Sequence, residues 1–381
     1  MYRNISEKAK KYFEDMGKYH FDITCELAQI PAPSWHEEKR AEWVKRFWDE
    51  LGGTQSYIDS ALNAVLPLNC DGCDEITVIQ AHTDVVFPDT DPLPLVIDGN
   101  YARCPGITDD TANLTGLLMV SKYILENGLT PKKGLLIVAN SGEEGLGNLK
   151  GTKQIFEDYK GRIKNFISFD GHMGAVCNDA VGSHRYKVEV KTEGGHSYGD
   201  FGNRNAIAIL ADMIGTFYTM KVPSMGKTTY NVGAIEGGTS VNSIAQNASM
   251  LYEYRSDNMD SLAIMENFFN KVIEAYRAMG IEVNVEVLGK RPCKGKMDEE
   301  EFEKYTSAIQ EICEGITGRK HGRYPGSTDA NIPLSLGIPG VTIGIVDGKG
   351  AHTREEYLVI DSQPIGLQLA ATVVAQYFDE F

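Results

Sequence analysis

Runs of apolar residues alternate with helical patterns through the first half of the chain. The runs ITVIQ, GLLIVAN and NFISFD are short and apolar on both faces, whereas TANLTGLLMVSKYILENG and LKGTKQIFEDYKG carry apolar residues at helical spacing. Strands without a polar face are typical of a parallel sheet that is covered by helices. The pattern therefore predicts an α/β fold with a mixed, largely parallel sheet sandwiched by helices.

The segment SWHEEKRAEWVKRFWDELGG predicts an amphipathic helix before the first of these strands. Ala41, Val44 and Trp48 lie on one stripe of it, and a pair of glycines ends it. Ser34 and Glu37 have the spacing of a capping box, in which the serine hydroxyl accepts a hydrogen bond from the first helical turn. We therefore expect Ser34 to cap this helix.

The pattern changes at about residue 184. Six elements follow in the order β-α-β-β-α-β, which is the order of a ferredoxin-like unit, and the α/β pattern resumes beyond Pro292. A chain of 381 residues also exceeds the usual size of a single hydrophobic core. We therefore expect a discontinuous α/β domain of residues 1–183 and 294–381, interrupted by an inserted α+β, ferredoxin-like domain of residues 184–293.

Charge and cysteine content narrow the function classes. The formal net charge is −16, which argues against nucleic acid because no basic face could dominate that background. No apolar run approaches the ~20 residues of a membrane span. Seven cysteines, an odd number, in a chain with a charged amphipathic start indicate a reduced, cytoplasmic protein. The one close pair, Cys70 and Cys73, is better explained as a polar turn than as part of a metal site.

Acidic and histidine side chains follow four of the predicted strands. After these strands come His82 and Asp84, Glu143 and Glu144, Asp170, and His352, and the loop PGITDDTAN adds Asp109 and Asp110. Ligand crevices of open α/β sheets lie beyond the carboxyl ends of the strands. So many carboxylates repel one another unless cations compensate them, and bound metal supplies that charge. Two histidines with several acids suit zinc, cobalt or manganese better than calcium, and two metals sharing one carboxylate would use the whole set.

Eight motifs along the chain point to one family. They are AHTDVV, GITDDTAN, NSGEEGLGN, SFDG, GGHSYGDFGNRNAI, EGGTSVNSIA, STDAN and AHTREEY. In this order, and with an inserted lid, the sequence resembles the M20 clan of dinuclear zinc peptidases and deacylases, especially its peptidase T-like tripeptide aminopeptidase branch. The resemblance implies two divalent metal ions, zinc with cobalt or manganese as alternatives. One would be held by His82 and Asp170, the other by Glu144 and His352, and Asp109 would bridge them.

The resemblance also implies catalytic and substrate-contacting roles. Glu143 would be the general base of a reaction that runs through a metal-bridging hydroxide, and Asp84 would orient the His82 ring. His196 would reach the scissile carbonyl from the lid of a partner subunit, which implies a homodimer through the lid. The residues expected to contact the substrate are Asn242, Arg255 and Asp329.

One loop departs from the family pattern. The family usually continues Asp-x-Lys-(Ala/Gly)-Gly, whereas this chain has Asp109-Asp110-Thr111-Ala112-Asn113. Thr111 thus removes a cation from the neighbourhood of the metals. Either adjacent acid could act as the bridge, and we assign Asp109.

Several other functions compete with that of an aminopeptidase for di- and tripeptides. Within the family, an N-acyl-amino-acid deacylase or a carboxypeptidase would use the same metal chemistry. A dinucleotide-binding protein is disfavoured, because Gly145, Gly147 and Gly151 are spaced one residue too long and two acids occupy the pyrophosphate position. A non-catalytic relative is disfavoured because Glu143 and the expected ligands are all present.

Overall fold

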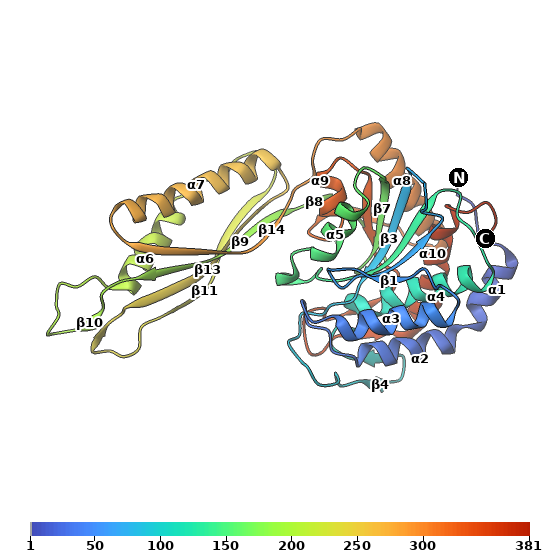
Figure 1. Cartoon of the computed structure of the whole chain (residues 1–381), viewed down its shortest axis with the longest axis horizontal. Coiled ribbons are helices and arrows are strands. Elements are labelled where there is room, and N and C mark those ends of the chain that lie inside the picture. Colours follow the sequence, from blue (N-terminus) through green and yellow to red (C-terminus); the bar gives the residue numbers. More distant parts are fainter. Residues whose placement is uncertain (1) are drawn as a thin grey trace. The chain divides into compact units, whose positions relative to one another are not determined.

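A computed structural model describes residues 2–381 of the chain. It divides into two compact units, each with its own sheet and helices (Figure 1). Unit 1 is made of Met1–Asp179 and Lys296–Phe381, and unit 2 is Ala180–Gly295.

Unit 1 is built on an eight-stranded sheet. Its strands, in spatial order, are β1 (Tyr57–Ile58), β2 (Ala64–Leu68), β6 (Gly134–Asn140), β3 (Ile76–His82), β7 (Ile163–Phe169), β16 (Gly340–Ile343), β8 (Ala175–Ala180) and β15 (Gly322–Gly326). The four central strands β6, β3, β7 and β16 pair in parallel, whereas β1, β2 and β8 pair antiparallel with their neighbours. Every residue of β3 and β6 is buried. The predicted mixed, largely parallel sheet is confirmed.

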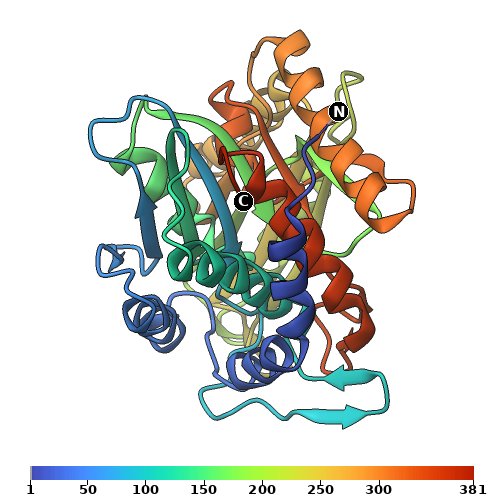
Figure 2. The ribbon, with the colours of Figure 1, turned by 90° about the vertical axis from the view of Figure 1, so that its right-hand side faces the viewer.

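Helices cover the sheet of unit 1 (Figure 2). They are α1 (Glu7–Asp15), α2 (Gly17–Ala28), α3 (Glu38–Glu50), α4 (Ala112–Glu126), α5 (Lys150–Asp158), α8 (Glu299–Thr317), α9 (Asn331–Ser335) and α10 (Gln363–Ala375). Ile79 and Ile167 share a buried cluster with apolar residues of α4 and α10. On the opposite side of β7, Phe166 packs against Phe156 of α5, with ring centroids 6.0 Å apart. Alternate residues of one strand thus face two helical layers, which explains why the strand has no polar side.

A second, four-stranded sheet in unit 1 brings two distant segments together. It has the order β17 (Gly348–Lys349), β18 (Tyr357–Val359), β5 (Tyr101–Arg103) and β4 (Val96–Asp98), with antiparallel pairing. Three short turns complete the unit: η1 (Ile107–Thr111), η2 (Gly145–Gly147) and η3 (Ile360–Ser362). Pairing of β5 with β18 places the chain that leads into η1 beside the loop between β17 and β18.

Unit 2 has the ferredoxin-like order of elements. They are β9 (Gly182–Lys191), α6 (Ala206–Phe217), β11 (Thr228–Gly237), β13 (Asn247–Ser256), α7 (Met259–Ala278) and β14 (Glu282–Arg291). The antiparallel sheet has the order β11-β13-β9-β14, and stacked rings of Phe217, Tyr252 and Phe269 lie in its core. A separate two-stranded ribbon pairs β10 (Gly195–His196) with β12 (Ser243–Ile244).

The capping-box prediction for Ser34 is wrong, because α3 begins at Glu38 without a side-chain cap and the Ser34 hydroxyl donates to Asp84 Oδ2 at 2.7 Å. The hydrogen bond that a hydroxyl donates to a buried carboxylate is stronger than the one it would accept from a neutral amide at a helix end.

Within residues 2–381, no helix combines the length and the apolar composition that crossing a membrane requires.

Candidate metal centre

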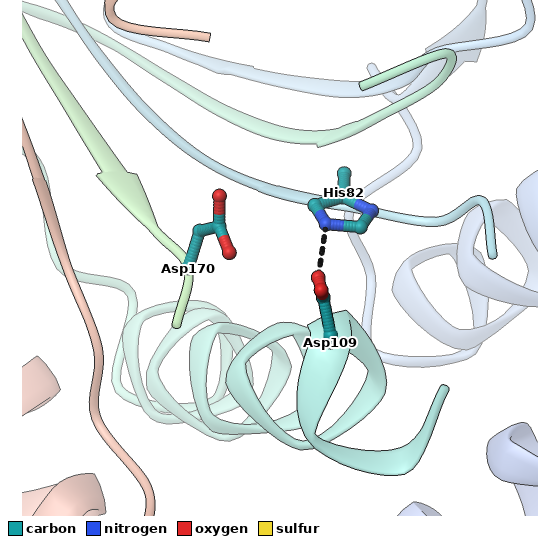
Figure 3. A group of neighbouring side chains, drawn as sticks. All are labelled: His82, Asp109 and Asp170. Carbon is teal, nitrogen blue, oxygen red and sulfur yellow. Dashed lines mark hydrogen bonds and ion pairs between the residues drawn. The ribbon is translucent and has the colours of Figure 1, made fainter. Parts of the chain in front are cut away.

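Parallel strands bring the polar strand ends of unit 1 to one edge of the sheet. His82 is the last residue of β3, Asp170 directly follows β7, and the turn after β6 carries Glu143 and Glu144. Because β6, β3 and β7 are parallel neighbours, their carboxyl ends meet. Asp109 comes from η1, directly before α4. Figure 3 shows His82, Asp109 and Asp170 turned toward one another from these three segments.

Five side chains form two groups with one member in common. His82, Asp109 and Asp170 make one group, and Asp109, Glu144 and His352 make the other, with the ligand atoms of each group within 4.8 Å of one another. Asp109 Oδ1 lies 3.1 Å from His82 Nε2, and Asp109 Oδ2 lies 3.1 Å from His352 Nε2. His352 Nε2 is also 3.3 Å from Glu144 Oε2. The two oxygens of Asp109 therefore face different groups, as a bridging carboxylate requires.

Positive charge compensates the acids of this cluster only in part. Burial, together with the charges of Asp109 and the adjacent glutamates, raises the pKa of Asp170 well above its usual value. Burial, with Asp109 and Glu143 adding to it, raises the pKa of Glu144 to about 8. Burial would also raise the pKa of Asp109, but hydrogen bonds from His352 and His82 outweigh it and lower that pKa. Divalent cations would supply the missing charge.

The donors fit two divalent cations. Each group offers one imidazole nitrogen and two carboxylates, a set that suits zinc, cobalt or manganese. Glu144 Oε1 is buried and has no hydrogen-bond partner among residues 2–381, although its other oxygen faces His352. A buried carboxylate oxygen without a partner is costly unless an ion or water satisfies it.

Asp84 holds two of the ligand-bearing segments together. His82 Nδ1 lies 3.0 Å from the main-chain carbonyl of Asp84 and 3.5 Å from its carboxylate, so it is mainly the carbonyl that fixes the ring. Donation from Nδ1 leaves Nε2 free for a metal. The Asp84 carboxylate accepts hydrogen bonds from the amides of Glu143 and Glu144, both at 3.0 Å. The expected orienting role thus belongs to the backbone of Asp84, and its side chain fixes the next turn.

Two further buried acids, which the sequence analysis did not assign, serve the same purpose. Asp110, joined to Asp109 by a cis peptide bond, accepts from the amide of His82 at 2.9 Å. The Glu356 carboxylate accepts from the amides of Gly106, Thr108 and Asp109 at 2.7, 2.8 and 3.0 Å, and also from the Thr108 hydroxyl at 2.7 Å. Glu356 thereby couples the loop that carries His352 to the segment that carries Asp109. The one sequence signal was its place in the AHTREEY motif.

A buried cation lies behind these acids. Arg40 of α3 is fully buried and donates to the carbonyls of Ile30 and Thr83 at 2.8 and 2.9 Å and to the Thr111 hydroxyl at 3.1 Å. Thr111 is the residue that departs from the family pattern. A positive charge therefore reaches this loop from a different element. The sequence signal for it was weak: Arg40 lies four residues before Val44, on the apolar stripe of the helix.

The His352 loop is fastened at its exposed side as well. Arg354 forms an ion pair with both oxygens of Asp89, at 3.0 and 2.6 Å, and its guanidinium lies 4.7 Å from the centroid of the Phe87 ring. His352 itself has a positive φ of 65°, which is rare for a non-glycine residue. The loop is thus held on both sides of His352, a candidate ligand that stands in a strained conformation.

Comparison with family models decides what kind of protein has this centre. The chain matches the model described as Peptidase family M20/M25/M40 over residues 78–376. The chain belongs to this family. The resemblance drawn from the motifs is confirmed, and the chain is a hydrolase of the peptidase type.

Solved structures of M20 proteins share the fold. A tripeptidase from Staphylococcus aureus subsp. aureus Mu50 superposes with a TM-score of 0.72 at 22% identity, covering 95% of this chain and 97% of that one. The aminopeptidase PepT of Bacillus cereus ATCC 10987 has a TM-score of 0.69 at 21% identity, with 95% and 98% covered. The YxeP protein of Bacillus subtilis, described as a dinuclear metal-binding M20 peptidase, has a TM-score of 0.62 at 15% identity, with 96% and 100% covered.

The residues that the family resemblance places in the lid lie in unit 2, where His196 and Asn242 are exposed and Arg255 is half-buried. His196 is on β10, and its Nδ1 accepts from the amides of Tyr198 and Gly199 at 3.3 and 3.2 Å. Asn242 belongs to the same ribbon, since its carbonyl accepts from the amide of Ser197 at 3.0 Å. Arg255 lies on β13 and forms an ion pair with Glu253 at 3.0 Å.

Asp329 does not occupy the position expected of a substrate contact. It is fully buried, and its two carboxylate oxygens accept from Asn140 and from the Thr152 hydroxyl, each at 2.6 Å. Burial raises its pKa to about 7. Both oxygens are therefore used to join the end of β6 to α5, and its predicted role in substrate binding does not fit this environment.

Proposed function

We propose that this chain is a two-metal aminopeptidase that hydrolyses di- and tripeptides. The observation that carries the proposal is the pair of donor groups that share Asp109. His82 and Asp170 would hold one ion, Glu144 and His352 the other, and Asp109 both. When bound, two such ions polarise the substrate carbonyl and lower the pKa of water. Zinc is the metal that we propose first.

Glu143 is proposed as the group that takes a proton from the attacking water and returns it to the leaving amine. It is nearly buried, at 7% exposed, and its amide is fixed by Asp84 at 3.0 Å. Its side chain therefore stands on a turn whose backbone is held in place before substrate arrives. Such preorganisation is what a proton-transfer group needs.

His196 is proposed to stabilise the developing oxyanion from the lid of a second subunit. Because backbone amides donate to its Nδ1, the neutral ring carries its proton on Nε2 and can donate there. Asn242 is proposed to contact the substrate from the same ribbon. Arg255 is proposed to bind an anionic end of the substrate. The homodimer and a cytoplasmic location are parts of the same proposal, the latter supported by the free cysteine thiols.

The choice of substrate rests on the kinds of relatives that share the fold. A tripeptidase and the aminopeptidase PepT are among them. A deacylase of N-acyl amino acids or a carboxypeptidase would use the same metal centre with a different pocket, so the substrate must be tested directly.

A substrate screen with the metal-loaded protein provides that test. We expect tripeptides with a free amino group to be hydrolysed at the N-terminal bond, with release of the first residue. The same tripeptides with an acetylated amino group, and N-acetyl amino acids, should react far more slowly. Preferred hydrolysis of the acetylated compounds would replace the aminopeptidase by a deacylase, and release of the last residue would replace it by a carboxypeptidase.

A further inference from the structure

Trp35 is an exposed aromatic residue in an unusual backbone conformation. Its side chain is 55% exposed, whereas the other two tryptophans, Trp43 and Trp48, are buried. Its φ is +76°, which for a bulky residue is a genuine outlier. Strain of this kind persists where the surrounding structure imposes it, and it is concentrated near functional sites.

The indole of Trp35 is held in one orientation. Its Nε1 donates to the carbonyl of Leu146 at 3.1 Å, and its backbone amide donates to Glu37 Oε1 at 3.0 Å. The ammonium of Lys150 lies 5.0 Å from the ring centroid and forms an ion pair with Glu37 at 2.9 Å. Both N–H groups of Trp35 thus have an acceptor, and the exposed part of its side chain is apolar ring surface.

Trp35 lies beside the turn that carries the proposed base. The preceding residue, Ser34, donates to the Asp84 carboxylate at 2.7 Å, and that carboxylate binds the amides of Glu143 and Glu144. Leu146, to which the indole is bound, comes two residues after Glu144 and is itself 56% exposed. An exposed indole and an exposed isobutyl group therefore flank the Glu143–Glu144 turn.

The contacts of Trp35 within the chain do not require this exposed surface. A smaller residue could leave the ion pair between Lys150 and Glu37 in place, and glycine would avoid the backbone strain. Exposed apolar side chains beside a polar cluster are typical of ligand sites, where a few polar groups orient the ligand and apolar walls select it. The exposed ring surface offers no hydrogen-bonding group and the ammonium of Lys150 already lies against the ring, so we expect an apolar occupant.

We infer that Trp35 and Leu146 form a subsite for one hydrophobic side chain of the peptide substrate. The inference rests on the proposed function and goes beyond it, because it names a class of substrate: peptides with an aliphatic or aromatic residue next to the bond that is cleaved. Contact with an apolar side chain would select such peptides over glycine-containing ones.

Kinetics with positional isomers test this selection. The peptides are Leu-Gly-Gly, Gly-Leu-Gly and Gly-Gly-Gly, and the proteins are wild type, Trp35→Ala, Trp35→Phe and Leu146→Ala. We expect Trp35→Ala to lower kcat/KM by about 10–100-fold for one leucine isomer and by less than about 2-fold for Gly-Gly-Gly. Trp35→Phe should retain most of the preference, and Leu146→Ala should lose part of it. An equal loss with all three peptides, or no loss, would overturn the inference.

Fluorescence provides a second readout that does not depend on turnover. Trp35 is the exposed tryptophan, so acrylamide quenching reports on it selectively. With the Glu143→Gln variant, the leucine isomer that the kinetics single out should protect the emission from acrylamide in a saturable way, and the double variant with Trp35→Phe should show no protection. Calorimetric binding of that isomer without protection would contradict the subsite. A change in oligomeric state of Trp35→Ala would instead make Trp35 an interface residue and also overturn it.

The two proposals fail in different ways. If metal-loaded wild type hydrolyses none of the peptides, the proposed function is wrong. If the wild type hydrolyses the peptides and Trp35→Ala keeps the same preference among them, only the subsite is wrong. Metal content and thermal unfolding of the variants show whether each is folded.

Discussion

The segments of unit 1 that carry the candidate ligands are tied to one another by buried side chains, whereas His196 and Asn242 of unit 2 stand on an exposed ribbon. Asp84, Asp110 and Glu356 each accept backbone amides from a different ligand-bearing segment. His196, in contrast, has contacts only within its own loop and the paired strand among those described.

This difference indicates how the two units contribute to the proposed reaction. Buried hydrogen-bonded carboxylates resist rearrangement, so the proposed metal centre of unit 1 would be set by one chain before any ligand binds. The ribbon of unit 2 leaves the His196 ring exposed with its Nε2 ready to donate. A role for His196 in catalysis then requires that another surface be brought to it, and the proposal that a partner subunit supplies this surface follows from the family resemblance.

The largest effect is expected when the proposed base of unit 1 is neutralised. Glu143→Gln keeps the shape of the side chain but removes the proton acceptor, so kcat should fall by at least about 10²–10⁴-fold. Metal content should stay at the wild-type value, because Glu143 belongs to neither ligand group. Steady-state kinetics and metal analysis of the same preparation check both. Near-normal turnover would show that the proton is carried by another group.

Removal of the His196 ring tests unit 2 in the same way. We expect His196→Ala to lower kcat by about 10²–10³-fold, as for loss of one oxyanion donor, with metal content unchanged.

The activity of a mixture of Glu143→Gln and His196→Ala then shows which chain supplies the His196 ring. If His196 acts on the partner's centre, dissociation and reassociation of Glu143→Gln with His196→Ala should restore about a quarter of wild-type activity, because half of the dimers are mixed and each has one complete site. A mixture that stays inactive despite exchange of subunits would place His196 on its own chain's centre.

A smaller effect is expected from one of the buried acids that tie the segments together. Glu356→Gln leaves one acceptor oxygen and places an amide donor against backbone donors. Metal affinity should fall by about 10–100-fold, as for other groups that support metal ligands. Competition with a chromophoric chelator measures the change. Glu355→Gln is the matched control, because Glu355 is exposed and adjacent, and equal affinities in both variants would deny Glu356 its role.

The smallest effect concerns the packing of unit 1. Burial lowers the pKa of His20 to about 4, so the folded chain resists a proton that the unfolded chain accepts below pH 6.5. The stability present above pH 6.5 is therefore lost as the pH falls toward 4, by up to about 3 kcal/mol. Urea unfolding of the metal-free protein at several pH values should show a shallower loss for His20→Gln. Parallel profiles for variant and wild type would contradict this.

The sequence located site residues correctly where the direction of a strand determines the position of the residue that follows it. His82, Asp170 and the Glu143–Glu144 pair come directly after strands, and parallel strands bring their ends together, so proximity could be predicted. Asp109 and His352 lie on loops rather than directly at strand ends, and the family resemblance supplied their expected roles as metal ligands. Arg40 and Glu356 were missed because their partners lie 43 and 248 residues away along the chain. Ser34 was assigned to the wrong partner, and the partners of Asp329 were missed, for the same reason, since local spacing does not reveal a buried acceptor or donor from another element.

Metal stoichiometry tests the central claim most directly. The metal-free protein is titrated with zinc, and bound metal is counted for wild type, Asp109→Asn, Asp170→Asn and His352→Asn. The shared carboxylate predicts about two equivalents for wild type, loss of tight binding at both positions in Asp109→Asn, and loss at one position in each of the other two variants. A wild-type protein that binds no zinc, or an Asp109→Asn variant that still binds two equivalents tightly, would contradict the shared two-metal centre.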